Sequence, residues 1–341
     1  MATQSINKTT NKSAAKSAAK SAANFAANPA AKSAAKAASN GASKLKATSR
    51  NGQSNGYAVT TQRLDVRKTY KIYIDGKFPR TESGRIYPLK DASGNIIANV
   101  CRGSRKDLRE SIVSNRKAQE GWAKKSAYNK GQILYRIAET LESRKAQFVD
   151  ILMKQGDAIS SARKETDAAI DVLVYYAGWC DKYIQVFSSV NPVESSHFNF
   201  SYPEPTGVVT VIAPQKQGLL GIVNLIAPMI IGGNVCTFIA SEKYPLTAVD
   251  FAEVLNASDV PGGVINIITG LQKEFLGHAS SHMDVNAILF SDLDQSQRKL
   301  VQENAALNIK RVLDFSKEET LSPYRILAAQ EIKTTWHPVG S

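Results

Sequence analysis

Residues 207–246, GVVTVIAPQKQGLLGIVNLIAPMIIGGNVCTFIASEKYPL, constrain the fold more than any other stretch of the chain. A β-branched apolar run at 208–213 leads through a loop to an apolar segment at 218–231, and a second apolar run follows the turn sequence GGN. Strand, loop, helix, turn and strand form a βαβ unit, the building block of a parallel sheet. Neither apolar run alternates with polar residues, so both strands are expected to be covered on both faces.

The apolar segment at 218–231 is too short to cross a bilayer, and Asn224 and Pro228 interrupt it. We therefore predict a buried core helix there. No apolar signal segment opens the chain, and no membrane span is predicted elsewhere in it.

On either side of this unit, the hydrophobic period alternates between that of strands and that of helices. The Asp75-Gly76 pair predicts a β-hairpin, and Ser104 with Asp107 predicts a capping box that opens a helix. The other predicted elements are strands at 85–89, 95–101, 262–269 and 285–291, and helices that include 133–141, 148–152, 170–184, 246–257, 274–281 and 298–307. This order predicts an α/β fold with a doubly wound parallel sheet.

Residues 1–66 form a separate low-complexity segment rich in Ala, Lys and Ser. Within residues 1–62, eight Lys and one Arg, with no acidic residue, carry +9 of the chain's net charge of +13. Lysines four residues apart repel one another, Pro29 interrupts the segment, and almost no apolar face is available for packing. We predict a disordered basic tail, followed by a folded domain at 67–315 and a C-terminal segment at 316–341.

We interpret this tail as a solvated spacer. The alternative is a polyanion-binding arm, because clustered lysines release counterions from phosphate chains. The spacer is favoured because no aromatic or Arg residues recur in the tail to contact bases. Because the positive charge is concentrated there, the global charge does not indicate that the folded part binds nucleic acid.

The three cysteines, Cys101, Cys180 and Cys236, lie far apart and lack the spacing of metal ligands. Nothing in this pattern indicates a disulfide framework, so we expect a reducing, cytoplasmic location. Cys236 lies inside an apolar strand, where a buried, inert thiol is favoured over a nucleophile. His337 has no partner at ligand spacing, so no metal site is predicted.

The central unit resembles the corresponding part of the aldehyde dehydrogenase family. In that family the first strand is followed by a Pro-Trp-Asn loop and the second by Lys-Pro-x-Glu, where this chain reads PQK from Pro214 and IASE from Ile239. The segments LVYYAGWCDK, VPGGVINIITG and SSHMDVNAILF resemble further family motifs, and the likeness covers most of residues 70–315. Tyr176 and Trp179, in the first of these segments, are interpreted as core residues. The resemblance implies a cofactor-type domain that, in the family, binds NAD or NADP.

Residue by residue, the resemblance implies that this cofactor site is degraded and that no cofactor binds. Lys216 stands where the family has an Asn that helps to hold the oxyanion, and Ile239 stands in place of the Lys that binds the adenosine ribose. Glu242 matches the second ribose ligand and is the one cofactor-binding residue predicted.

Asp292 adds a charge to this part of the site, because it lies in the segment that matches the family's Phe-Thr-Gly-Ser turn beside the diphosphate. We expect its carboxylate at the helix N-terminus, where a diphosphate would otherwise bind. A like charge at about 4 Å opposes binding by about 4 kcal/mol at an effective dielectric constant near 20, which is about three decades in affinity.

The family's catalytic residues are not matched. Its general-base glutamate stands in Glu-Leu-Gly-Gly-Lys, where this chain has Phe315 and no Gly pair, and Glu318 and Glu319 are out of register. The nucleophilic cysteine comes later in the family, in a second α/β domain, and no cysteine follows Cys236 here. We therefore predict no catalytic residue and a truncated family member that lacks the catalytic domain.

The C-terminal segment AQEIKTTWHPVG resembles the family's last strand, which pairs across the dimer interface. Ile332, Thr334 and Trp336 alternate with polar residues, which suits a strand whose apolar face is buried against a partner. We expect a homodimer, or a hetero-oligomer with a full-length aldehyde dehydrogenase. The alternative is a strand that folds back onto its own subunit.

Three interpretations of the function follow. The leading one is a non-catalytic aldehyde dehydrogenase-like subunit that assembles with itself or with a complete aldehyde dehydrogenase. The second is an NAD(P)-dependent aldehyde oxidoreductase whose altered active site uses Lys216 or Cys236 in a new role. The third and weakest is a polyanion-binding protein that acts through its basic tail.

Overall fold

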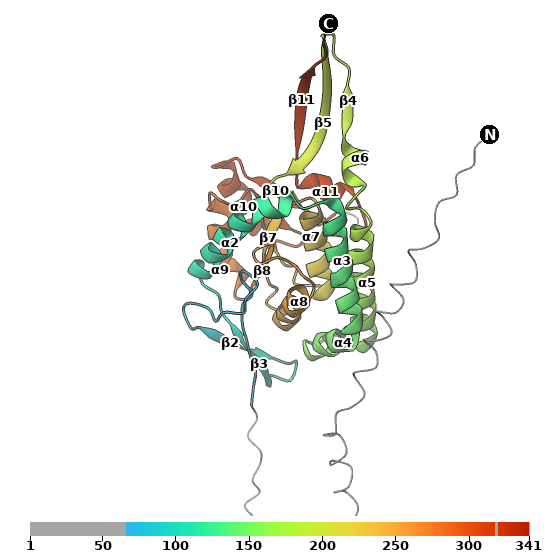
Figure 1. Cartoon of the computed structure of the whole chain (residues 1–341). Coiled ribbons are helices and arrows are strands. Elements are labelled where there is room, and N and C mark those ends of the chain that lie inside the picture. The colour runs from blue at the N-terminus through green and yellow to red at the C-terminus, as the bar shows by residue number, and fades with distance from the viewer. Residues whose placement is uncertain (1–65, 318–319, 341) are drawn as a thin grey trace, which may run out of the picture. The chain divides into compact units, whose positions relative to one another are not determined.

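The structure of the chain is a computed structural model that describes residues 66–317 and 320–340. These residues form a doubly wound α/β domain, a small N-terminal sheet and a projecting three-stranded arm (Figure 1). The predicted fold class is therefore confirmed for this part of the chain. The predicted tail lies outside the described residues, as do Glu318 and Glu319.

The central sheet contains five parallel strands in the order β10-β9-β6-β7-β8. The predicted βαβ unit supplies its middle, and every residue of β6 and β7 is buried. The strands are β6 (Val208–Ile212), β7 (Val235–Ile239), β8 (Ile265–Ile268), β9 (Ala287–Phe290) and β10 (Arg311–Asp314). The chain thus winds outward from β6 first in one direction and then in the other, so the strand order reverses between β6 and β9.

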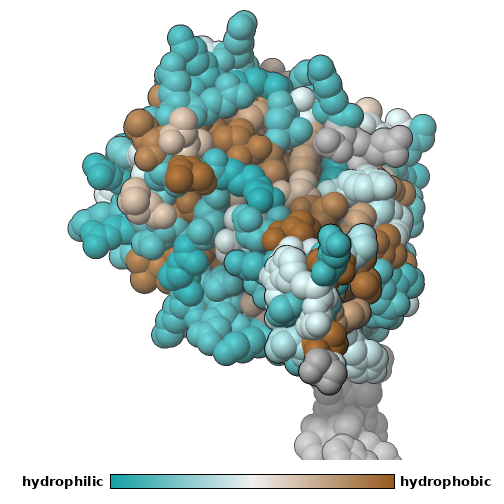
Figure 2. All heavy atoms as spheres, turned by 90° about the horizontal axis from the view of Figure 1, so that it is seen from above, coloured by the Kyte–Doolittle hydropathy of each residue, from teal (hydrophilic) through white to brown (hydrophobic). Residues whose placement is uncertain are grey.

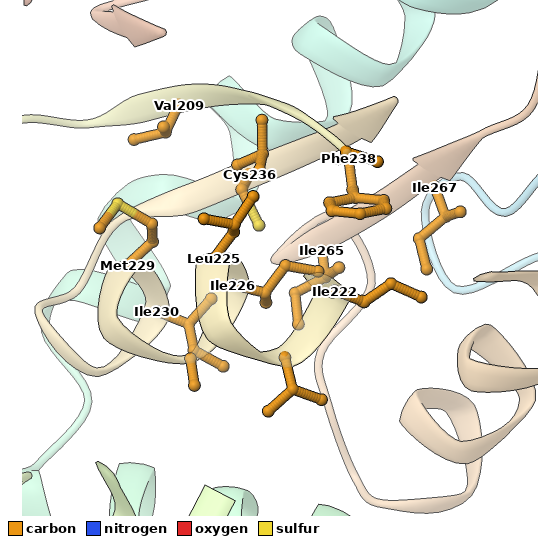
Figure 3. Packing of buried hydrophobic residues seen from close by; sticks show 14 of the residues in the cluster. Val209, Ile222, Leu225, Ile226, Met229, Ile230, Cys236, Phe238, Ile265 and Ile267 are labelled. Atoms are coloured by element: carbon orange, nitrogen blue, oxygen red, sulfur yellow. The ribbon is translucent and has the colours of Figure 1, made fainter. Parts of the chain in front are cut away.

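Helices cover both faces of this sheet, which explains why its strands are apolar on both sides. On one face, Cys236 and Phe238 of β7 point toward α7 (Leu219–Ile231), as Figure 3 shows. On the other face, Thr237 of β7 hydrogen-bonds to α2 (Arg105–Ala123). The remaining layers are α8 (Pro245–Ala257), α9 (Gln272–Ser281) and α10 (Gln295–Ala306), with α3 (Ala127–Ser143), α4 (Lys145–Lys154) and α5 (Ile159–Ala177) packed outside α7 and α8.

The helix α7 is buried on all sides, which matches its almost uniformly apolar sequence. Pro228 lies inside it and has no N–H to donate to the carbonyl of Asn224, four residues earlier. The guanidinium of Arg325, on the short helix α11 (Tyr324–Ala328), donates to that carbonyl instead at 3.3 Å. A proline in α7 is therefore compensated by a buried arginine a hundred residues later.

The N-terminal elements partly follow the prediction. β1 (Thr69–Tyr70), β2 (Ile86–Lys90) and β3 (Ile96–Cys101) form a small sheet, and the Ser104–Asp107 capping box is confirmed at the start of α2. The Asp75-Gly76 turn also forms, but it joins only an isolated bridge between Ile74 and Lys77. The hairpin does not extend because Tyr73 exchanges 2.8 Å backbone hydrogen bonds with Ile267 at the edge of β8.

The long helix predicted through residue 184 is wrong at its C-terminal end. α5 ends at Ala177, Gly178 follows as a poor helix former, and residue 184 belongs to the separate five-residue helix α6 (Tyr183–Phe187). Tyr176 is buried in the core as predicted. Trp179 lies after the helix and is half-buried against that core.

The arm is an antiparallel sheet in the order β11-β5-β4 that projects from the domain (Figure 1). It contains β4 (Ser189–Asn191), β5 (His197–Pro205) and β11 (Gln330–Pro338). The predicted C-terminal strand exists, but it pairs over nine residues with β5 of the same chain, which is the folded-back alternative. The other edge of β11 pairs with no strand among residues 66–317 and 320–340.

The described helices include none that is long and apolar enough to cross a membrane.

Asn234 joins the central sheet to the base of the arm. It is fully buried; its Oδ1 accepts a hydrogen bond from the backbone N–H of Gly207 at 2.8 Å, and its Nδ2 donates to the carbonyl of Ala329 at 2.9 Å. We expect Asn234→Ala to lower the free energy of unfolding by about 1–3 kcal/mol, because it leaves the buried backbone N–H of Gly207 without its partner. Urea unfolding of the variant measures this change.

The matched control is Asn129→Ala, which removes an exposed amide on α3. We expect it to change the free energy of unfolding by less than about 0.5 kcal/mol. Equal losses in the two variants would contradict the role assigned to Asn234.

Candidate functional site

The candidate site lies where the parallel strands end at their carboxyl termini. In open α/β sheets, ligands bind in the crevice at this edge, at the point where the strand order reverses. That point lies between β6 and β9 in this chain. The loop after β6 divides the edge into two parts, one toward β7 and β8 and the other toward β9 and β10.

The part toward β7 is filled by the side chain of Gln272. This residue begins α9 and is 6% exposed. Its Nε2 donates to the carbonyl of Ala213, after β6, at 2.8 Å and to the carbonyl of Ala240, after β7, at 3.3 Å. One side-chain amide thus closes the crevice between the ends of the two strands.

Gln215 reinforces this closure from the loop after β6. Its Oε1 accepts hydrogen bonds from the hydroxyl of Ser241 at 2.8 Å and from the backbone N–H of Glu242 at 3.1 Å. Its own backbone N–H donates to Asp292 Oδ2 at 2.7 Å. The loops after β6, β7 and β9 are therefore tied together by protein groups alone.

Glu242, the predicted cofactor-binding residue, has an exposed side chain beside this closure. Its Oε1 accepts a hydrogen bond from the backbone N–H of Gln272 at 2.9 Å, at the start of α9. A carboxylate is favoured there because the helix dipole places partial positive charge at that end. Contact of Glu242 with a ribose stays a prediction, and Ile239 is fully buried at the end of β7.

The position expected for Asp292 is wrong. α10 begins at Gln295, and its N-cap is Asp294, which forms a capping box with Gln297. Asp292 lies before the helix, in the loop, where it accepts the hydrogen bond from Gln215. Its charge therefore lies near the loop after β6 rather than on the axis of α10.

The part of the edge toward β9 and β10 contains a cavity of about 300 Å³. The walls include Lys216 from the loop after β6, Asp292 from the loop after β9 and Phe315 after β10. Arg325 closes the cavity from α11, with its guanidinium carbon 4.8 Å from the centre of the Phe315 ring. Lys216 and Phe315, which the sequence placed at degraded catalytic positions, thus lie around the same space.

The three cysteines are buried and unpaired. Burial raises the pKa of Cys180 to about 12 and raises that of Cys236, in β7, well above its ordinary value. A thiol with a raised pKa forms little thiolate at neutral pH, and the thiolate is the nucleophile. Their burial and these raised pKa values support the prediction that Cys236 is an inert core residue.

A dinucleotide bound in the manner that the resemblance implies does not fit these residues. The crevice between β6 and β7 already holds the amide of Gln272, and Glu242 already accepts a helix N–H. Neither Gln272 nor Arg325 was predicted from the sequence. The only sequence signal for Gln272 is its position as a polar residue that closely follows a buried apolar strand, and the sequence of α11 shows no helical pattern.

A family model described as "Aldehyde dehydrogenase family" matches residues 78–314. The chain is 29% identical over 248 residues to an aldehyde dehydrogenase of Davidiella tassiana, covering 71% of this chain and 49% of the relative. It is 28% identical over 249 residues to the omega-crystallin of Enteroctopus dofleini, covering 72% and 50%. The solved NAD+ complex of an aldehyde dehydrogenase from Bacillus cereus has a similar fold, with a TM-score of 0.69, 22% identity and coverage of 72% and 50%. The chain thus spans about half the length of these proteins.

Burial of all three thiols predicts slow chemical labelling of the folded protein. We expect Ellman's reagent at pH 8 to label none of the three cysteines within minutes, and to label all three after unfolding in urea. The raised pKa values of Cys180 and Cys236 act in the same direction, because they lower the thiolate fraction at this pH.

The control for this measurement is Cys236→Ala, which is expected to leave the labelling rate of the folded protein unchanged and to lower the count after unfolding by one. A thiol that reacts within seconds in the folded wild type, and disappears in this variant, would instead identify Cys236 as an accessible nucleophile.

Proposed function

The chain belongs to the aldehyde dehydrogenase family, and we propose that it acts within that family as a non-catalytic subunit that assembles through its arm. The observation that carries the first half of this proposal is the Gln272 amide in the crevice between β6 and β7. The second half rests on the arm, whose exposed residues suit a contact with another chain.

A non-catalytic role is supported by the way the cofactor-type site is satisfied internally. Ala213, Ala240 and Glu242 carry polar groups that a ligand could engage, and each is already hydrogen-bonded to Gln272. A ligand that displaced the Gln272 side chain would leave the buried carbonyls of Ala213 and Ala240 in need of new donors, and each carbonyl left unpaired would cost about 1–3 kcal/mol. The burial of the cysteines also argues against the alternative of an oxidoreductase that uses Cys236.

Assembly through the arm is supported by apolar side chains that reach the surface. Ile332 is 53% exposed and Trp336 is 57% exposed on β11, and Val190 and Phe198 are exposed on the adjoining strands. Seen from the end that carries the arm, apolar side chains reach the surface at several places between polar ones (Figure 2). The unpaired edge of β11 could also accept another strand.

We propose a second copy of this chain as the first partner and a full-length aldehyde dehydrogenase as the alternative. The arm is the surface that suits either one, because it combines apolar side chains with an open strand edge. A cytoplasmic location is part of this proposal and rests on the buried, unpaired thiols.

Calorimetric titration tests the cofactor half of the proposal. We expect the wild-type protein to bind NAD or NADP no more tightly than about 1 mM. Combining Gln272→Gly with Asp292→Gly should increase the affinity at least about tenfold, because it empties the crevice and removes a like charge.

The matched control keeps Gln272 and carries only Asp292→Gly. Its crevice still contains the amide, so no measurable binding is expected from it. Micromolar binding of either nucleotide by the wild-type protein would show that the crevice opens, and the proposal would fail.

Sedimentation velocity tests the assembly half. We expect the wild type to sediment as a dimer or larger, and Ile332→Lys with Trp336→Lys to shift it toward monomer, because two charges would enter an apolar contact. The paired control, Val113→Lys with Val174→Lys, changes exposed apolar residues on α2 and α5 and should leave the distribution unchanged.

Point substitutions are preferable to deletion of residues 330–341, which would also remove the strand that pairs with β5. The assembly proposal is contradicted if the wild type sediments as a monomer and retains no full-length aldehyde dehydrogenase from its host.

A further inference from the structure

The open edge of β11 is a row of backbone groups that pairs with no other strand of the described part of the chain. In an antiparallel pair, every second residue of a strand exchanges both of its hydrogen bonds with the neighbouring strand. Two bonds at the ends of the β11–β5 ladder show which residues these are. The N–H of Val339 donates to the carbonyl of Ser196 at 3.1 Å, and the N–H of Thr206 donates to the carbonyl of Ala329 at 3.2 Å. The odd-numbered residues of β11 therefore bond to β5, and the even-numbered ones direct their N–H and C=O groups toward the open edge.

The free part of this edge has a defined beginning and end. At its beginning, the carbonyl of Gln330 already accepts a hydrogen bond from the guanidinium of Arg311 at 2.6 Å. At its end, Pro338 has no N–H to donate. Between them, three residues each direct one N–H and one C=O outward: Ile332, Thr334 and Trp336.

This arrangement is symmetric about Thr334, so the edge is complementary to a second copy of itself. When two copies of β11 pair antiparallel with their Thr334 residues opposite each other, Ile332 of one copy lies opposite Trp336 of the other. All three outward-directed residues are then in hydrogen-bonded pairs, and each pair exchanges two hydrogen bonds. The side chains of Ile332 and Trp336, which are 53% and 57% exposed in the single chain, meet across the two strands as a stabilising aliphatic–aromatic pair.

The neighbouring registers are less favourable. With Lys333 at the centre, the two Lys333 side chains lie opposite each other, and like charges in that position destabilise a strand pair. With Thr335 at the centre, Ile332 lies opposite Pro338, which lacks a donor. The register centred on Thr334 avoids both defects.

The shape of the arm leaves room for such a pair. β11 contains nine residues, so it is about 30 Å long, and the arm projects away from the α/β domain (Figure 1). In the register centred on Thr334, the base of one β11, at Gln330, lies opposite the end of the other, at Pro338. The two α/β domains therefore lie at opposite ends of a shared sheet that contains the three arm strands of each copy.

We infer that two copies of this chain pair along β11 in this register, with Thr334 at the twofold axis. The inference rests on the proposed assembly through the arm. It specifies the partner, which is a second copy, and the contact, which is a continuous antiparallel sheet. A partner of any other kind would not meet this edge at a symmetric point.

Disulfide cross-linking of the full-length protein tests the register. Thr334→Cys places two cysteines opposite each other at a Cα separation of about 5.5 Å, which is suitable for a disulfide. We expect copper phenanthroline to convert most of the dimer to a covalent dimer on a non-reducing gel, because the native cysteines are buried and do not compete. The matched control is His337→Cys. Its equivalent in the second copy lies about 20 Å away along the strands, so we expect no cross-link.

A proline substitution tests the backbone contact itself. Thr334→Pro removes an N–H that faces the open edge and leaves the bonds to β5 in place, because proline is tolerated where the N–H faces outward. The twofold axis doubles the loss, so we expect the dissociation constant of the dimer, measured by sedimentation, to rise at least about tenfold. The control is Thr334→Ala, which keeps the N–H and removes only the hydroxyl that lies 2.8 Å from that of Ser201. We expect it to change the dissociation constant less than about threefold.

The pairing along β11 is overturned if a dimer forms but Thr334→Cys does not cross-link it, or if His337→Cys cross-links equally well. It is also overturned if Thr334→Pro dimerises like the wild type. In these cases a dimer that Ile332→Lys with Trp336→Lys dissociates would still support assembly through the arm. A wild type that sediments as a monomer would overturn the pairing and leave a full-length aldehyde dehydrogenase as the remaining partner for the proposed function.

Discussion

The backbone groups at the carboxyl ends of the parallel strands need hydrogen-bond partners, and the choice of those partners governs what this molecule can bind. In α/β proteins such groups face the crevice in which ligands bind. Here one glutamine amide serves the carbonyls of Ala213 and Ala240, and another glutamine serves the backbone N–H of Glu242. The protein has thus supplied internally what a ligand would otherwise provide, and each buried carbonyl that a bound ligand left unpaired would cost about 1–3 kcal/mol.

On the side of β6 that faces β9 and β10, some of the buried polar groups have hydrogen-bond partners and one does not. Pro228 deprives the carbonyl of Asn224 of its helical partner, and Arg325 supplies one, which draws a buried cation to the end of the sheet. The side-chain oxygen of Asn224 receives no such partner among the described residues. The packing of α7 therefore places two polar groups, the Arg325 guanidinium and the Asn224 side chain, in the wall of the cavity.

Much of this fold could be predicted because the core strands and α7 are uniformly apolar over their whole length. Elements that are buried on both faces consist of apolar residues throughout, and such runs can be recognised from the local sequence. As a result, β6, α7 and β7 begin and end within two residues of their predicted bounds. The site could not be predicted in the same way. Its decisive contact joins Ala213 to Gln272, 59 residues away, and no local pattern encodes such a pairing. Asp292 was misplaced for a related reason, since Asp294 two residues later is an equally good cap.

The strand β5 was not predicted, although Phe198, Phe200 and Tyr202 alternate with polar residues in the pattern that is typical of a half-buried strand. Polar residues hold the three arm strands in register. Asn191 Nδ2 donates to Asn199 Oδ1 at 2.6 Å and to Ser201 Oγ at 2.8 Å, and the hydroxyl of Ser201 lies 2.8 Å from that of Thr334 on β11. A three-stranded sheet with little core of its own is only marginally stable, so this row of hydrogen bonds matters more here than it would in the domain.

Such a row orders the arm before any partner binds. Because the strands are already paired within one chain, docking a second chain would not have to fix their backbone, and the entropy lost on association would be smaller. The exposed apolar residues Ile332 and Trp336 lie on the same face as Thr334 and therefore on a surface whose geometry is set in advance. Intrachain pairing of β11, which the sequence analysis gives as the alternative to assembly, is thus compatible with the proposed assembly.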